Sequence, residues 1–122
     1  IIVADKDIDD DVYPLLSMTD FLITDYSGIY FDYLLVNKPI IYLIYDFDRY
    51  INVDREFYFP FEEVTPGPKV SLWKQLIPTI HREIRKDTFK KKRQKMTKLF
   101  HTHKDGNSSK RVAEKIYKEF VT

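Results

Sequence analysis

The chain has 122 residues, 43% of them hydrophobic, and a formal net charge of +1, which supports one globular domain with a modest core. It contains no cysteine, so a disulfide scaffold and any thiolate metal site are excluded. The longest apolar run, residues 39–45, is far shorter than the roughly 20 residues that a membrane-spanning helix requires. Since the sequence opens on Ile1-Ile2-Val3 without an initiating methionine, we expect it to be part of a longer polypeptide.

Apolar runs and turn residues alternate through the first 45 residues. They predict strands at residues 1–4, 21–24 and 40–45, and helices at residues 9–18 and 27–36. The sequence Asn37-Lys38-Pro39 ends the second helix, because proline cannot continue it. Short strands separated by helices are typical of a parallel sheet with right-handed crossovers, so the predicted fold class is α/β.

The second half of the chain begins with a long irregular segment. Residues 46–69 alternate acidic with aromatic side chains and close with Pro66-Gly67-Pro68, which predicts a rigid turn. An irregular segment of this length inside a compact domain is usually a functional loop. A loop that is merely held to the core by its aromatic side chains gives the same pattern, so both interpretations stay open.

Three helices are predicted after this segment, at residues 71–85, 87–100 and 108–120. Ser71 and Asp87 are expected to cap the first two, and Pro78 threatens to interrupt the first. The residues expected on the inward faces are Leu72, Leu76 and Ile80 in the first helix, Phe89, Met96, Leu99 and Phe100 in the second, and Val112, Ile116 and Phe120 in the third.

The turn Asp25-Tyr26-Ser27-Gly28 lies between the second predicted strand and the helix that follows it. Ligands of parallel sheets bind at the carboxyl ends of the strands, and the first backbone N–H groups of a helix are available to bind an anion. We therefore expect the amides of residues 27–29 and the Ser27 hydroxyl to hold a phosphate, and Asp32 to accept hydrogen bonds from a ribose. A plain helix cap would use the same residues, and neither a P-loop nor a G-x-G-x-x-G motif is present.

A longer pattern surrounds this turn. Residues 24–33, Thr-Asp-Tyr-Ser-Gly-Ile-Tyr-Phe-Asp-Tyr, and residues 37–41, Asn-Lys-Pro-Ile-Ile, resemble the signature of the CDP-glycerol glycerophosphotransferases. The similarity continues, in the same order, at residues 45–50, 57–59, 62–68 and 105–111. The resemblance therefore covers most of the chain. Enzymes of this family polymerise the glycerol-phosphate chains of teichoic acids and related polymers.

The resemblance implies a GT-B fold, which consists of two Rossmann-like halves with the active site between them. Residues 1–122 would form a single domain, most of the C-terminal, nucleotide-donor-binding half. By the family's pattern, Ser27 and Gly28 would contact the phosphates of CDP-glycerol and Asp32 its ribose, with Asp25 and Tyr26 completing the substrate-binding turn. The family usually carries two serines here, so Gly28 is a departure that removes one hydroxyl.

The family's catalytic histidines lie upstream of the matching region. No catalytic residue is therefore expected in this chain, which alone should not catalyse transfer. No cofactor is implied. Three histidines are present, His81, His101 and His103. His101 and His103 lack a third ligand nearby, so we predict no metal site and expect both to face solvent.

The expected function is the donor-binding part of a transferase that moves glycerol phosphate from CDP-glycerol to a growing cell-wall or capsular polymer. One alternative is a GT-B transferase that uses CDP-ribitol or a sugar nucleotide. Another is a non-catalytic domain that binds a membrane or an acidic polymer. Different donors would give the same turn, so the sequence leaves these alternatives open.

A basic run in the predicted helix at residues 87–100 gives a second candidate surface, formed by Lys90, Lys91, Lys92, Arg93 and Lys95. It would suit an anionic membrane surface, which predicts a cytoplasmic protein held peripherally at the inner face of the cell membrane. It would also suit a polyol-phosphate acceptor, and a solvated outer face is the plain alternative. Nucleic acid is not expected as a partner, because no recognised binding motif accompanies the run.

Overall fold

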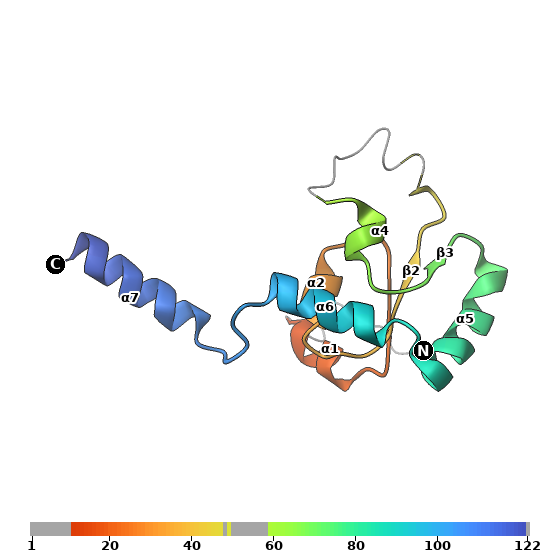
Figure 1. Ribbon diagram of the computed structural model, residues 1–122, viewed down its shortest axis with the longest axis horizontal. Helices are drawn as coiled ribbons and strands as arrows, with labels where there is room; N and C mark the ends of the chain where they lie inside the picture. Colours follow the sequence, from red (N-terminus) through yellow and green to blue (C-terminus); the bar gives the residue numbers. More distant parts are fainter. Residues whose placement is uncertain (1–10, 48, 50–58, 122) are drawn as a thin grey trace.

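A three-stranded parallel sheet lies at the centre of the fold (Figure 1). The computed structural model describes residues 11–47, 49 and 59–121, so the strand predicted at residues 1–4 lies outside the described residues. Strand β1 (Leu22–Thr24) pairs with β2 (Ile40–Leu43), and β2 pairs with β3 (Lys69–Val70). Both pairings are parallel, which confirms the predicted α/β class.

The helices of the first half are shorter than predicted. Helix α1 (Tyr13–Met18) has a proline in its first turn, and the part of its predicted range before residue 11 lies outside the described residues. Helix α2 (Ile29–Tyr33) has only five residues, because the backbone then tightens into i→i+3 hydrogen bonds that end at Asn37. Asn37 adopts a left-handed conformation with φ 56°, which turns the chain toward β2.

The predicted long loop contains regular structure that the sequence analysis did not anticipate. Helix α4 (Phe61–Val64) and strand β3 lie at its end, while residues 48 and 50–58 lie outside the described residues. Gly67 allows the chain to reach β2, since a Cβ atom there would lie 2.0 Å from the carbonyl oxygen of Ile40. A single close approach thus converts the end of the loop into an edge strand.

The three C-terminal helices were predicted correctly in number and nearly in extent. They are α5 (Trp73–Lys86), α6 (Lys90–Phe100) and α7 (Ser108–Phe120). Pro78 lies inside α5 without interrupting it. The predicted caps were wrong: α5 begins after Leu72, whose N–H donates to Gln75, and Asp87 ends α5 in a left-handed conformation instead of starting α6.

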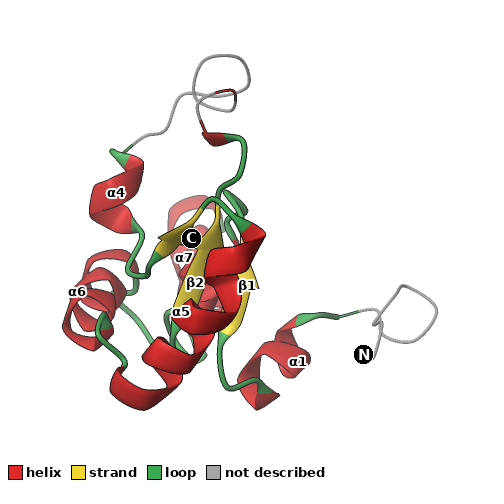
Figure 2. Cartoon of the chain, turned by 90° about the vertical axis from the view of Figure 1, so that its right-hand side faces the viewer, coloured by secondary structure: helices red, strands yellow, loops and turns green. Residues whose placement is uncertain are grey.

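The core consists of two clusters on opposite faces of the sheet. Side chains alternate along β2, so that Ile40 and Tyr42 join the cluster with α2 and α6, while Ile41 packs with β3 and α5. Figure 2 shows α4 and α6 together on one side of the sheet. This arrangement leaves the carboxyl ends of β1 and β2 bordered by α4.

Several predicted inward faces differ from the structure. Met96 is buried and Phe100 packs against Phe31, as predicted, but Leu99 is 58% exposed and Leu72 is 49% exposed. In α7 the apolar stripe exists, yet Phe120 and its neighbours on the stripe are exposed, because the helix extends away from the rest of the described chain (Figure 1). No helix among the described residues is long and apolar enough to cross a membrane.

Candidate functional site

The turn of residues 25–28 directly follows the carboxyl end of β1 and leads into α2. Residues 45–47, which follow β2, reach the same edge of the sheet. The side chains of Asp25 and Ser27 and the backbone of Gly28 are exposed, whereas Tyr26 and Asp32 are half-buried. The structure thus places the predicted turn at the edge where parallel sheets bind ligands.

The hydrogen bonds of the turn differ from the prediction in one respect. The Ser27 N–H donates to Oδ1 of Asp25 at 2.8 Å, so this amide is not available to an anion as predicted. The Ile29 N–H lies 3.5 Å from Oγ of Ser27, which is a long contact. Within the described residues, the Gly28 N–H has no partner. Asp25 therefore shapes the turn, and the donors it leaves are the Gly28 amide and the Ser27 hydroxyl.

Gly28 has ordinary helical geometry. Its φ is −67° and its ψ is −8°, and a Cβ atom would lie 4.0 Å from the nearest heavy atom, Cδ2 of Phe31. Neither a left-handed conformation nor a crowded neighbour requires glycine at this position. A serine, the residue that the family resemblance implies here, would fit without rearrangement.

Tyr26 links the turn to the segment after β2. Its hydroxyl donates to Oδ1 of Asp46 at 2.8 Å, and its ring packs at 6.0 Å from Phe47 and 5.9 Å from Phe61. Burial, reinforced by the Asp46 carboxylate, raises the pKa of Tyr26 far above its ordinary value, so the hydroxyl stays protonated. Tyr26 thus positions the turn through its side chain. Asp46 was not predicted as a site residue, and the one local signal for it is its position shortly after a parallel strand.

Asp32 lies in the first turn of α2, as predicted. A carboxylate in this position is stabilised by the positive end of the helix. The end of α6 also contacts α2, since Nε2 of His101 lies 2.7 Å from the carbonyl oxygen of Phe31. His101 is half-buried, so the expectation that it faces solvent was wrong, while His103 is exposed. No cluster of three potential metal ligands occurs among the described residues.

A half-buried lysine of β3 holds the end of α4 in place. Lys69 donates to the carbonyl oxygens of Thr65 at 2.7 Å and Gly67 at 3.0 Å, and pairs with the Glu62 carboxylate at 3.5 Å. Its ammonium also lies 5.1 Å from the centre of the Tyr42 ring. Burial lowers the pKa of Lys69 to about 8. Lys69 was not singled out from the sequence, because a lone lysine between turn residues carries no distinctive pattern.

The basic side chains of α6 do not all face solvent. Arg93 is fully buried and Lys92 donates to the carbonyl oxygen of Glu62, whereas Lys90, Lys91 and Lys95 point into solvent. The prediction that Arg93 belongs to a membrane-facing surface was therefore wrong. The charge of Arg93 is instead used inside the fold, where it pairs with an aspartate.

Comparison with known proteins adds to this geometry. The family described as CDP-Glycerol:Poly(glycerophosphate) glycerophosphotransferase matches residues 2–118. The teichoic acid ribitol-phosphate primase of Bacillus spizizenii is 37% identical over 86% of this chain and 26% of its own length. The teichoic acid poly(glycerol phosphate) polymerase of the same organism is 32% identical over 87% of this chain and 27% of its own length.

Solved structures show the same relationship. A His-to-Ala variant of the wall teichoic acid polymerase TagF superposes with a TM-score of 0.77 and 28% identity, over 95% of this chain and 29% of that chain. A His-to-Asn variant of TagF soaked with CDPG gives a TM-score of 0.69 and 28% identity, over 85% of this chain and 26% of that chain. The described fold is therefore shared with part of TagF. The chain spans about a quarter of the length of these relatives.

Proposed function

Because the chain belongs to the CDP-glycerol:poly(glycerophosphate) glycerophosphotransferase family, we propose that it forms the donor-binding part of an enzyme that transfers glycerol phosphate from CDP-glycerol to a growing polymer. The observation that carries this proposal is the exposed turn of residues 25–28 at the carboxyl edge of the sheet. It lies inside the region that matches the family, and it presents the Gly28 N–H and the Ser27 hydroxyl as donors.

In this reaction an acceptor hydroxyl attacks the phosphorus that carries glycerol. A new oxygen–phosphorus bond forms, the bond to the CMP oxygen breaks, and the proton of the hydroxyl passes to a base. The residues of this chain would act on the donor. The Gly28 amide and Ser27 hydroxyl would bind the diphosphate, Asp32 would accept from the ribose, and Asp25 and Tyr26 would hold the turn in place.

The donor could also be CDP-ribitol. A specific observation supports this second candidate, because a ribitol-phosphate primase is 37% identical over 86% of this chain. The polyol end of the donor lies beyond the phosphates, so contacts from the turn alone do not distinguish a three-carbon from a five-carbon polyol. Binding of both nucleotides to the complete protein decides between them.

Calorimetric titration of the complete protein tests the donor site. The Ser27→Ala and Asp32→Ala variants should each weaken binding of CDP-glycerol, or of CDP-ribitol, by about tenfold, since each loses one hydrogen bond to the nucleotide. Ser17→Ala is a matched control, because Ser17 is exposed on α1, which leads to the amino end of β1, at the opposite edge of the sheet from the turn. Wild-type affinity in both turn variants would show that the turn is not the donor site.

We also propose that the complete protein associates peripherally with the inner face of the cell membrane. The support is local: Lys90, Lys91 and Lys95 are exposed on α6 and form no ion pair with a described residue. Each such cation near an anionic surface contributes about 1 kcal/mol. Flotation with phosphatidylglycerol vesicles should therefore decline when all three become glutamine, and undiminished flotation would contradict the proposal.

A further inference from the structure

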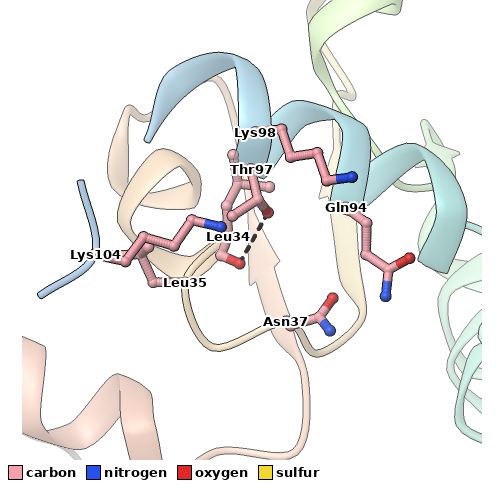
Figure 3. A pocket seen from close by; sticks show the side chains of 7 residues that line it. All are labelled: Leu34, Leu35, Asn37, Gln94, Thr97, Lys98 and Lys104. Carbon is pink, nitrogen blue, oxygen red and sulfur yellow. Dashed lines mark hydrogen bonds between the residues drawn. The ribbon is translucent and has the colours of Figure 1, made fainter. Parts of the chain in front are cut away.

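A polar groove lies at the opposite edge of the sheet from the turn of residues 25–28. Leu34, Leu35 and Asn37 form one wall where the chain leaves α2, and Gln94 and Lys98 of α6 form the other, with Lys104 at the end (Figure 3). Its volume is about 390 Å³, within the range of small-molecule sites. Because α2 starts at the carboxyl end of β1 and returns to the amino end of β2, this groove is separate from the donor turn.

The walls of the groove are held together by buried polar contacts. The guanidinium of Arg93 donates to the Asn37 side-chain oxygen at 3.2 Å and to its carbonyl oxygen at 3.1 Å. The Thr97 hydroxyl donates to the carbonyl oxygen of Leu34 at 3.2 Å (Figure 3). Since its oxygen is already engaged by Arg93, the Asn37 amide group retains its NH₂ as a donor. The groove is therefore a preformed feature of the packing between α2 and α6.

The chemistry of the lining is that of an anion site. Lys98 and Lys104 supply two ammonium groups, Asn37 and Gln94 supply amide groups, and the lining contains no carboxylate. Neither lysine forms an ion pair with any described residue. Helix α6 itself has no acidic residue, so the field along this wall is uniformly positive. The exposed side chain of Leu35 adds an apolar contact along the other wall.

We propose that this groove binds a phosphodiester of the polyol-phosphate polymer, away from the point of transfer. The ammonium groups match the phosphate, the amides match flanking hydroxyls, and the exposed Leu35 matches the carbon backbone. A membrane surface fits less well, because the donors line a concave groove between α2 and α6. The polymer as ligand rests on the proposed function, whereas the anion chemistry rests on the groove alone.

The test measures binding of a short synthetic oligo(glycerol phosphate) to the complete protein. Changing Lys98→Gln and Lys104→Gln together should weaken this binding by about fivefold or more and leave CDP-glycerol affinity unchanged. The matched control is Lys74→Gln with Lys86→Gln, which removes the same charge from exposed, unpaired positions of α5 within the described structure. The control pair should bind the oligomer as the wild type does.

Three results would overturn the proposal. If the Lys98→Gln, Lys104→Gln protein binds the oligomer as tightly as the wild type, the groove is not the binding site. Equal losses of affinity in this protein and in the control double variant would indicate diffuse charge attraction. If the Lys98→Gln, Lys104→Gln protein keeps its affinity for the oligomer but no longer floats with phosphatidylglycerol vesicles, the groove binds a membrane and not the polymer. Ser27→Ala keeps the two proposals distinguishable, since loss of donor binding with intact oligomer binding reports on the turn alone. Oligomer binding in a protein that binds no CDP-polyol would retain the groove and refute the proposed donor function.

Discussion

The guanidinium of Arg93 is completely buried and forms a two-point ion pair with the carboxylate of Asp87, at 2.8 and 2.6 Å. Asp87 ends α5, and Arg93 lies one turn into α6, so the pair fixes the angle between the two helices. The same guanidinium holds Asn37 in its left-handed conformation at the start of β2. One side chain thus connects the corner between α5 and α6 to Asn37, which lies 56 residues earlier in the sequence.

Arg93→Ala should destabilise the protein by about 3–5 kcal/mol, because the change leaves the partners of a buried charge without their counterpart. Urea unfolding measures the loss. Lys91→Ala is the control, since Lys91 is exposed on the same helix and its removal should alter the free energy of unfolding by less than about 0.5 kcal/mol. Equal, small effects for the two variants would contradict a structural role for Arg93.

Removing the buried hydroxyl of Tyr42, unlike removing Arg93, should not destabilise the protein. Tyr42 is 0% exposed and its hydroxyl has no hydrogen-bond partner within the described structure. Tyr42→Phe should therefore leave the free energy of unfolding unchanged or raise it by about 1 kcal/mol, because an unsatisfied buried polar group is removed while the ring contacts remain.

Tyr33→Phe is the matched comparison for Tyr42→Phe. Tyr33 is equally buried, but its hydroxyl lies 3.0 Å from the Thr19 hydroxyl. Removing this hydroxyl should lower the free energy of unfolding by about 1 kcal/mol. Thermal unfolding of both variants checks the contrast, and a lower melting temperature for Tyr42→Phe than for Tyr33→Phe would refute it.

The sequence predicted the order of the central elements and the place of the turn, because buried strands and helix-ending residues leave local patterns. It did not predict β3, since two residues are too few to show a period and their pairing depends on the close approach at Gly67. It also placed Arg93 on the surface. A charge run along a helix gives no indication that one member has a buried partner contributed by the preceding helix end.

In the candidate site, too, local features were predicted from the sequence and long-range contacts were not. The position of Ser27 and Gly28 followed from the strand–turn–helix pattern, which is local. The contact between Tyr26 and Asp46 spans twenty residues and depends on how the segment after β2 folds back, so no local pattern reports it. Long-range polar contacts of this kind become visible only when the sheet register is known.

The lowered pKa of Lys69 predicts that the free energy of unfolding increases at alkaline pH. Burial lowers its pKa to about 8 in the folded protein, against an ordinary value of 10.5 in the unfolded chain. Between these values the unfolded chain binds more protons than the folded one, so the free energy of unfolding should increase with pH. Urea midpoints measured from pH 8 to pH 10 check this, and Lys69→Met should flatten the increase.

Above about pH 10 the buried tyrosines reverse this trend. Burial raises the pKa values of Tyr30, Tyr33 and Tyr42 above their ordinary value, so the unfolded chain loses these protons first and stability falls as pH rises further. The tyrosinate absorbance of these three residues should therefore appear only together with loss of helical circular dichroism. Ionisation of these tyrosines in a fully folded protein would contradict the burial described here.

Gly28→Ser tests whether the departure from the family's two serines matters for donor binding. The fold should accept the change, because a Cβ atom at Gly28 meets nothing closer than 4.0 Å and its φ of −67° suits any residue. The added hydroxyl should strengthen binding of CDP-glycerol by about threefold to tenfold in calorimetry. Gly67→Ser is the control for steric cost, since its Cβ would lie 2.0 Å from the Ile40 carbonyl oxygen and should destabilise the sheet. A Gly28→Ser protein that folds normally yet binds the donor no better would show that a second hydroxyl does not reach the phosphates.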